Sequence, residues 1–125
     1  MRIRALSDVD VAEVVQLIRE SFDPGLLRYM IYGQRGAGEY LRSLIGGSGH
    51  QTVTVTAGGQ VVAYSDFHVG QSEAHLNYLC VARDARRRGL ARAHLENFVT
   101  EHPRAARISL DVFEHNAPAI ELYRR

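Results

Sequence analysis

Residues 79–91 carry more information about this chain than any other stretch, because they combine an apolar strand pattern, a basic turn and the start of a helical pattern. After the strand come three arginines and the first helical positions, namely Arg86, Arg87, Arg88, Gly89, Leu90 and Ala91. Backbone N–H groups at a helix N-terminus lack acceptors within the helix, and the helix dipole is positive there. A glycine at this point also lets a phosphate approach the main chain. The segment therefore predicts an anion site.

Two common phosphate-binding motifs are missing from this segment. The phosphate loop of nucleotide-hydrolysing enzymes ends in Gly-Lys-Ser/Thr, and the dinucleotide fingerprint has three spaced glycines. Residues 86–91 show neither pattern. A nucleoside triphosphate and a nicotinamide cofactor are therefore disfavoured, and an ordinary strand-to-helix turn with solvated arginines stays open as the plainer alternative.

A second strand-to-helix pattern lies in residues 108–123. Residues 108–113 alternate between aliphatic positions and others, which is typical of a strand and places Asp111 away from the aliphatic face. Asn116 then suits a helix N-cap, and Pro118 falls in the first turn, where proline is tolerated. The chain therefore has two successive strand-to-helix units.

Together, these segments resemble the GCN5-related N-acetyltransferase (GNAT) family. The first is similar to the family's acyl-coenzyme A pyrophosphate loop through the spacing of Arg86, Gly89 and Ala91. The second is similar to the family's Asn-x-x-Ala-x-x-Leu-Tyr segment, which matches at Asn116, Ala119, Leu122 and Tyr123. Some of the resemblance is to ribosomal-protein N-terminal acetyltransferases. Two motifs in the expected order are more specific than one.

The resemblance implies one α/β domain over residues 1–125, an acyl-coenzyme A N-acyltransferase-like domain. Its mixed, mostly antiparallel twisted sheet would have parallel, splayed fourth and fifth strands and about four flanking helices. Periodicity predicts strands at residues 1–6, 52–56, 61–69, 73–82 and 108–113. It predicts helices at residues 11–22, 26–32, 38–45, 90–101 and 116–123. Ser7 and Asp10 resemble a capping pair before the first helix, and Gly58-Gly59 suits a hairpin turn. The buried side of the helix at 90–101 is expected to hold Leu90, Leu95, Phe98 and Val99.

The chain ends at Arg125, where family members usually continue with a Gly-Phe turn and two more strands. The resemblance therefore implies a domain shortened at its C-terminus, without those strands and with its fifth strand at an exposed edge. Three explanations stay open. A second subunit covers the edge in a homodimer, the sequence is a shortened form of the domain, or the domain is catalytically compromised.

Charge and composition exclude several classes of protein. The net charge of +1 disfavours a general polyanion binder, so nucleic acid is not an expected partner. The single cysteine, Cys80, excludes a disulfide framework and indicates a small buried hydrophobe. The six histidines do not share metal-ligand spacing on one element, so no metal is expected. No apolar run approaches the ~18 residues of a membrane span, and we expect a cytoplasmic protein without a membrane partner.

The cosubstrate implied by the resemblance is acetyl-coenzyme A. Its diphosphate would bind residues 86–91, and its pantetheine arm would pair with the strand edge of Leu79, Cys80 and Val81 almost as an extra strand. Asn116 would hydrogen-bond that arm. Core packing of the strand side chains and simple helix capping by Asn116 are the plainer alternatives.

Acetyl transfer to an amine needs a group that accepts a proton. A lysine amine has a pKa near ~10.4 and is mostly protonated at neutral pH, yet only the neutral amine attacks a thioester. Asp111 is the first candidate base, because some ribosomal-protein acetyltransferases carry a catalytic glutamate on that strand. Glu73, near the start of the fourth strand, is the second. A surface carboxylate is the alternative for Asp111 and the plainer interpretation of Glu73.

The leaving coenzyme A thiolate needs a proton in return. Tyr123 matches the family's tyrosine in that role, since a phenol has a pKa near ~10. Packing of its ring in the core is the alternative. A main-chain N–H of the fourth strand would polarise the thioester carbonyl.

Three functions follow from these patterns. The preferred one is an N-acetyltransferase that acts on a primary amine of a small molecule or peptide, and its competitor is a non-catalytic coenzyme A-binding sensor or regulatory module. A weaker third is phosphate-backbone binding through the basic turn, which lacks the interleaved aromatic residues of a nucleic-acid surface. The acceptor is expected near Tyr29, Tyr32 and Tyr40, with Asp66, Glu73 and Asp111 available to attract a cationic amine.

Overall fold

The computed structural model describes residues 1–22, 25, 36–47, 49–70, 73–103 and 107–110. Its strands are β1 (Arg2–Ala5), β2 (His50–Val55), β3 (Val61–Val69), β4 (Glu73–Val81) and β5 (Arg107–Leu110). Its helices are α1 (Val11–Ser21), α3 (Ala37–Leu44) and α4 (Leu90–Glu101), with 3-10 turns η1 (Asp8–Asp10) and η3 (Arg83–Ala85) before α1 and α4.

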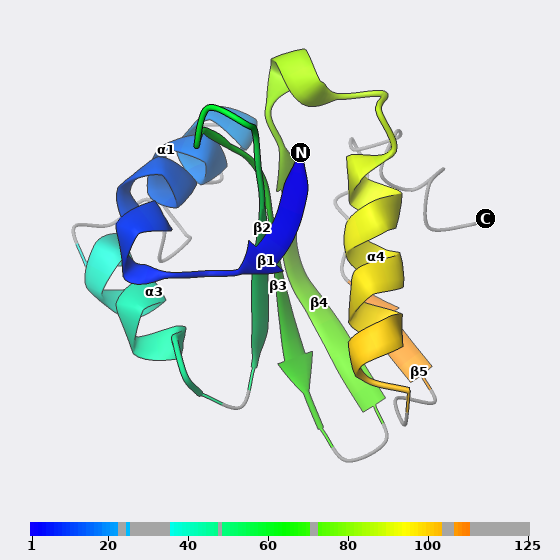
Figure 1. Ribbon diagram of the computed structural model, residues 1–125. Helices are drawn as coiled ribbons and strands as arrows, with labels where there is room; N and C mark the ends of the chain where they lie inside the picture. Colours follow the sequence, from blue (N-terminus) through cyan, green and yellow to red (C-terminus); the bar gives the residue numbers. More distant parts are fainter. Residues whose placement is uncertain (23–24, 26–35, 48, 71–72, 104–106, 111–125) are drawn as a thin grey trace.

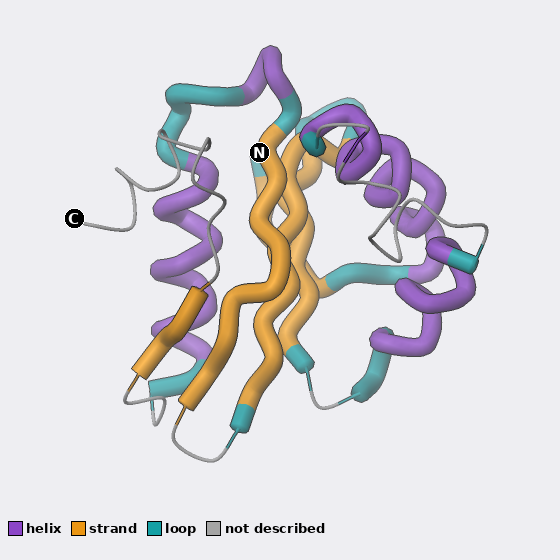
Figure 2. The backbone as a smooth tube through the Cα atoms, turned by 180° about the vertical axis from the view of Figure 1, so that it is seen from behind, coloured by secondary structure: helices purple, strands orange, loops and turns teal. Residues whose placement is uncertain are grey.

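The strands form one sheet in the order β1-β2-β3-β4-β5. Neighbours from β1 to β4 are antiparallel, whereas β4 and β5 are parallel. Helices α1 and α3 cover one face and α4 covers the other (Figure 1), and the view from behind shows the same three layers (Figure 2). The predicted mixed sheet with parallel fourth and fifth strands is confirmed.

Several predicted features lie outside the described residues. They are the helices at 26–32 and 116–123, the strand residues after Leu110, and the side chains Asp111, Asn116 and Tyr123. The predicted splay of β4 from β5 also concerns this region, because the pairing of these strands is described only for Glu73–Leu76 with Arg107–Leu110.

The start of α1 is fixed by Asp10. The Ser7 N–H donates to its carboxylate at 2.9 Å, and the Arg4 guanidinium donates to both oxygens at 2.6 and 2.8 Å. These hydrogen bonds, that of Arg4 foremost, hold the pKa of Asp10 below its ordinary value although burial opposes them. The predicted Ser7/Asp10 capping pair is confirmed, and it ties β1 to α1.

The face under α1 and α3 holds the larger apolar core. Its buried residues come from both helices, from three strands and from the β1–η1 connection: Leu6, Val11, Val14, Leu17, Ile18, Ala37, Leu41, Val53, Val55, Val61, Tyr64 and Cys80. The helical repeat predicted for residues 11–22 is confirmed, since its apolar stripe faces this core.

The face under α4 is packed differently. Its apolar cluster is small, consisting of Phe67, Ala74, Leu76 and Phe98, with the two phenylalanine rings stacked at 4.0 Å between centroids. Beside it His94 is fully buried. The predicted inward position of Val99 is wrong, because Val99 is 51% exposed and the helix docks through the neighbouring His94–Phe98 stripe instead.

Four side chains form a buried hydrogen-bond network at this interface. The Thr54 hydroxyl lies 2.7 Å from Nε2 of His94, and the Ser65 hydroxyl lies 2.7 Å from its Nδ1. The Thr52 hydroxyl lies 2.7 Å from that of Ser65 and 3.2 Å from Nδ1. Because such bonds are directional, this network sets the rotation of α4 on the sheet.

Candidate functional site

The turn between β4 and α4 has an unusual backbone. The Ala82 N–H donates to the Val62 carbonyl at 2.8 Å and so anchors the beginning of the turn to β3. Farther on, Arg87 and Gly89 have φ angles of 66° and 75°, in the left-handed region. Glycine adopts this conformation without steric penalty, whereas arginine does so rarely. Such turns bring successive amides to one side of the chain.

The amides of this turn are open. Ala93 is the first residue of the helix whose N–H reaches a preceding carbonyl, that of Gly89, at 2.9 Å. The amides of residues 87–92 have no acceptor within the described part of the chain. The Arg86 N–H points to the Arg83 carbonyl at 3.4 Å, so the open amides begin one residue later than the sequence predicted. These donors and the positive end of the α4 dipole suit an anion.

Three exposed arginines surround these amides. The Arg86 side chain turns back to β4, where its Nε donates to the Val81 carbonyl at 3.2 Å. Arg87 and Arg88 form no ion pair with any described residue. A side chain at Gly89 would meet no atom of the described residues within 4 Å, so none of them fills the space before the helix. The turn therefore combines open donors, positive charge and room for a ligand.

β4 presents a strand edge beside this turn. Residues Leu79 to Val81 pair with β3 on one side, and no described strand lies against them on the other. Leu79, Cys80 and Val81 thus occupy the predicted edge. The side chain of Leu79 packs with the α4 cluster and that of Cys80 with the opposite core. A ligand at this edge would therefore contact the main-chain N–H and C=O groups.

Cys80 is a buried thiol. Burial raises its pKa to about 12, which keeps the sulfur protonated at neutral pH. The prediction that it acts as a small hydrophobe in the core is confirmed.

A bulge interrupts β4 beside the same edge. Asp66 pairs with Tyr78 and the next β3 residue, Phe67, pairs with Leu76, which leaves Asn77 as an extra residue. Bulges bend a strand and redirect its side chains. The bulge therefore gives β4 a local distortion that strand periodicity did not predict.

Of the predicted catalytic residues, Glu73 is the one that lies within the described part of the chain. Glu73 is exposed at the first residue of β4, and the arginine turn follows the other end of the nine-residue strand, about 25 Å away at a rise of ~3.3 Å per residue. Asp111 and Tyr123 lie outside the described residues. The structure thus describes the predicted cofactor residues from 79 to 91 as one strand-and-turn unit, with Glu73 at the far end of the strand.

Asp66 is a buried carboxylate that sequence reasoning named only as an attractor of amines. It is 3% exposed, and the Gln51 side-chain nitrogen donates to it at 2.8 Å. Burial raises its pKa, although hydrogen bonds from Gln51 and Asn77 act in the opposite direction. All of residues 61–67 are buried, so this strand lacks the alternation of buried and exposed side chains. Its sequence pattern therefore does not indicate that Asp66 is buried.

Comparison with known protein families identifies the family of this chain. A family model described as "Acetyltransferase (GNAT) family" matches residues 12–125. The chain belongs to the GNAT family. The match spans both motifs on which the resemblance depends, and no curated protein sequence matches the chain.

Solved structures agree with this GNAT assignment at the level of the fold. BH1408 from Bacillus halodurans, as a tetramutant, has a TM-score of 0.80 at 20% identity, covering 99% of this chain and 90% of that chain. PaiA N-acetyltransferase from Thermoplasma acidophilum, in complex with coenzyme A, has a TM-score of 0.81 at 15% identity, with 98% and 86% covered. The ribosomal-protein-S18-alanine N-acetyltransferase of Escherichia coli gives 0.74 at 23%, with 98% and 74% covered.

No helix among the described residues is long and apolar enough to cross a bilayer.

Proposed function

We propose that this GNAT protein transfers the acetyl group of acetyl-coenzyme A to a primary amine. The observation that carries the proposal is the row of open amides at residues 87–92, flanked by arginines and next to the edge of Leu79 to Val81, against which no described strand lies. Family membership and the coenzyme A bound to the PaiA structure support the same cosubstrate.

The diphosphate of the cosubstrate would bind where charge and donors coincide. Amides of Arg87 to Ala91 would donate to its oxygens, with the positive end of α4 behind them. The exposed guanidinium groups of Arg87 and Arg88 would neutralise its charge. The pantetheine amides would pair with main-chain groups of Leu79 to Val81, as an added strand does, and Asn116 would bind the same arm.

The reaction needs no covalent enzyme intermediate. The neutral amine attacks the thioester carbonyl carbon, a C–N bond forms, and the C–S bond breaks when the tetrahedral intermediate collapses. A base removes one proton from the amine nitrogen, and an acid gives one proton to the leaving sulfur. Asp111 and Glu73 are the proposed bases and Tyr123 the proposed acid.

Asp66 joins the proposed bases because of its surroundings in the sheet. Its raised pKa makes its carboxylate a better proton acceptor than an exposed aspartate. It is also paired with Tyr78 at the bulge of β4, beside the strand edge assigned to the pantetheine arm. The three carboxylates therefore give separate hypotheses, which substitution of each will distinguish.

An acetylation assay with a panel of amines tests the function. The panel includes a peptide with N-terminal alanine, a lysine peptide, a polyamine and an aminoglycoside, because structural neighbours are named for ribosomal-protein alanine and aminoglycoside substrates. We expect turnover of at least one amine. Saturable binding of acetyl-coenzyme A without acetylation of any amine would contradict the proposal and favour a coenzyme A-binding module.

Variants separate catalysis from binding in the same assay. If Asp111 and Tyr123 act as proposed, Asp111→Asn and Tyr123→Phe lower kcat by about 10²- to 10⁴-fold while the Kd for acetyl-coenzyme A stays unchanged. Asp66→Asn and Glu73→Gln are measured in parallel. Unchanged kcat in a variant removes that residue from the mechanism.

A further inference from the structure

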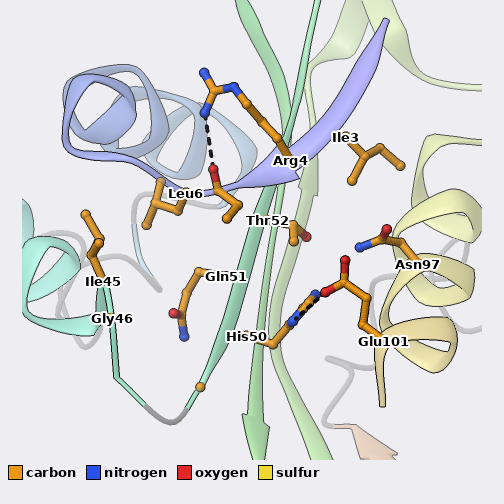
Figure 3. Close-up of a pocket in the computed structure, with 12 residues that line it drawn as sticks. Ile3, Arg4, Leu6, Ile45, Gly46, His50, Gln51, Thr52, Asn97 and Glu101 are labelled. Atoms are coloured by element: carbon orange, nitrogen blue, oxygen red, sulfur yellow. Dashed lines mark hydrogen bonds and ion pairs between the residues drawn. The ribbon is translucent and has the colours of Figure 1, made fainter. Parts of the chain in front are cut away.

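Three side chains with metal-ligating atoms meet where the beginning of β2 reaches the end of α4. Nδ1 of His50 lies 3.5 Å from a carboxylate oxygen of Glu101 and 3.1 Å from Nε2 of His102. The three ligand atoms all lie within 4.8 Å of one another. Figure 3 shows Glu101 extending from α4 toward the His50 ring, with their contact dashed.

We propose that His50, Glu101 and His102 bind a divalent transition-metal ion, with Zn²⁺ as the best match. Two imidazole nitrogens and one carboxylate are a ligand set that zinc uses in proteins, with a fourth position left open. Zn–N and Zn–O bonds of ~2.0–2.2 Å at tetrahedral angles place neighbouring ligand atoms about 3.3–3.6 Å apart. The two distances from His50 Nδ1, 3.1 and 3.5 Å, lie close to this range.

The His50 ring is held in place by aromatic neighbours. Its side chain is only 10% exposed, and it makes edge contacts with Phe67 and Phe98 at centroid distances of 6.3 and 5.3 Å. Its Nε2, on the far side of the ring, is buried and has no partner among the described residues. Within that part of the chain, the polar contacts of the ring are therefore those with Glu101 and His102.

A metal ion would complete these contacts in a way that a proton does not. One proton between His50 and His102 satisfies a single nitrogen pair and leaves the carboxylate with a long contact, whereas a cation attracts all three groups. A neutral imidazole is the form that coordinates metal, and each of the two rings offers one nitrogen to the ion.

The end of α4 also favours a cation. Glu101 is its last residue, and His102 is its C-cap, whose N–H donates to the Phe98 carbonyl at 2.9 Å. The negative end of the helix dipole lies here. A cavity of about 180 Å³ lined in part by His50, Asn97 and Glu101 lies next to the cluster, which gives water access to the open coordination position (Figure 3).

The metal would lie apart from the proposed acetyl-coenzyme A site. The open amides are at the opposite end of the 12-residue α4, about 18 Å away at ~1.5 Å per residue. Its expected role is to clamp the helix to β2. The site therefore does not depend on the proposed function, and metal binding can be measured without cosubstrate.

Calorimetric titration of the EDTA-treated full chain with ZnCl₂ tests the site. We expect saturable binding of one Zn²⁺ per chain. Glu101→Gln and His102→Ala should each weaken that binding by about 100-fold or more, since outer-sphere changes alone cost ~10–100-fold. His68→Ala, which removes an exposed histidine on β3, is the matched control and should keep the wild-type affinity.

Cobalt gives an independent readout of geometry. Co²⁺ bound by the wild-type chain should show the intense visible absorption of a tetrahedral site, and His102→Ala should lose it. Because Glu101 is 55% exposed and ends its helix, its replacement leaves the fold intact, which circular dichroism verifies. Absence of saturable zinc binding, or equal affinity in wild type, Glu101→Gln and His102→Ala, would overturn the proposal.

Discussion

The two faces of the sheet hold their helices by different forces. Under α1 and α3 the contact is an apolar core in which Ile18 and Leu41 are fully buried. Under α4 the apolar cluster is small, and a histidine bonded to strand hydroxyls lies beside it. Apolar contacts tolerate small rotations, whereas hydrogen bonds fix direction. The helix with the directional contacts is the one whose first turn carries the open amides, so its orientation determines where those amides point.

The largest loss of stability is expected on the apolar face. Ile18→Ala removes a fully buried side chain and leaves a cavity, which should lower the free energy of unfolding by about 2–5 kcal/mol. Val9→Ala, at a position that is 82% exposed, should change it by less than about 0.5 kcal/mol. Urea denaturation measures both variants. Similar losses in the two would mean that the core under α1 does not carry the stability assigned to it.

Acid should weaken the polar face. Burial lowers the pKa of His94 to about 4, whereas an unfolded histidine has a pKa of ~6.5. Between these values the unfolded chain binds the proton first, so stability falls as the pH falls. The loss from pH 6.5 to 4 should be roughly 3 kcal/mol for this group, at ~1.4 kcal/mol per pH unit.

His94→Gln is the variant that isolates this pH dependence. Denaturation curves across the same pH window should become flatter in the variant, because it lacks the titrating ring. His50→Gln serves as the comparison, since the pKa of His50 is also lowered by burial and its loss should remove only part of the slope. An unchanged slope in His94→Gln would show that other groups cause the acid sensitivity.

Removal of one hydroxyl from the network should cost less. Thr54→Val keeps the shape of the side chain but leaves Nε2 of His94 without its partner at 2.7 Å, with an expected loss of about 1–3 kcal/mol. Thr100→Val changes an exposed threonine on α4, the helix that carries His94, and should change the free energy of unfolding by less than about 0.5 kcal/mol. Thermal denaturation of the pair measures the difference, and equal midpoints would contradict the directional role of the network.

The smallest effect is expected at the arginine turn. Arg87→Gly relieves an unfavourable positive φ, so stability should stay constant or rise by up to about 1 kcal/mol. If Arg87 neutralises the diphosphate, the same change should weaken coenzyme A binding by about tenfold, equal to ~1.4 kcal/mol. Arg2→Ala on β1, at the far edge of the sheet, should change neither quantity. Tighter or equal coenzyme A binding in Arg87→Gly would contradict the assignment.

Patterns within a few residues predicted much of the fold. The turn at Gly58 and Gly59, the helix over residues 11–22 and the strand-to-helix unit at residues 79–91 follow from local chemistry, and the structure confirms them. The open amides were predictable because helix ends leave the same donors unpaired in every protein.

Contacts between distant segments were not predictable in this way. His94 bonds to Thr54, which is 40 residues away, and nothing near either residue signals the pair. His50 and His102 are 52 residues apart, so they show no metal-ligand spacing within a single helix or strand. Periodicity predicts Val99 on the buried side of α4 because valine is more apolar than histidine. The hydroxyls of β2 and β3 instead favour burial of His94.

Backbone ¹H–¹⁵N spectra recorded during a titration with coenzyme A test most directly whether the main chain at the start of α4 holds the diphosphate. We predict large shifts for the amides of residues 87–92, and much smaller ones with pantetheine, which lacks the diphosphate. Saturation with coenzyme A that leaves those amides unshifted would contradict the assignment of the cosubstrate to this turn.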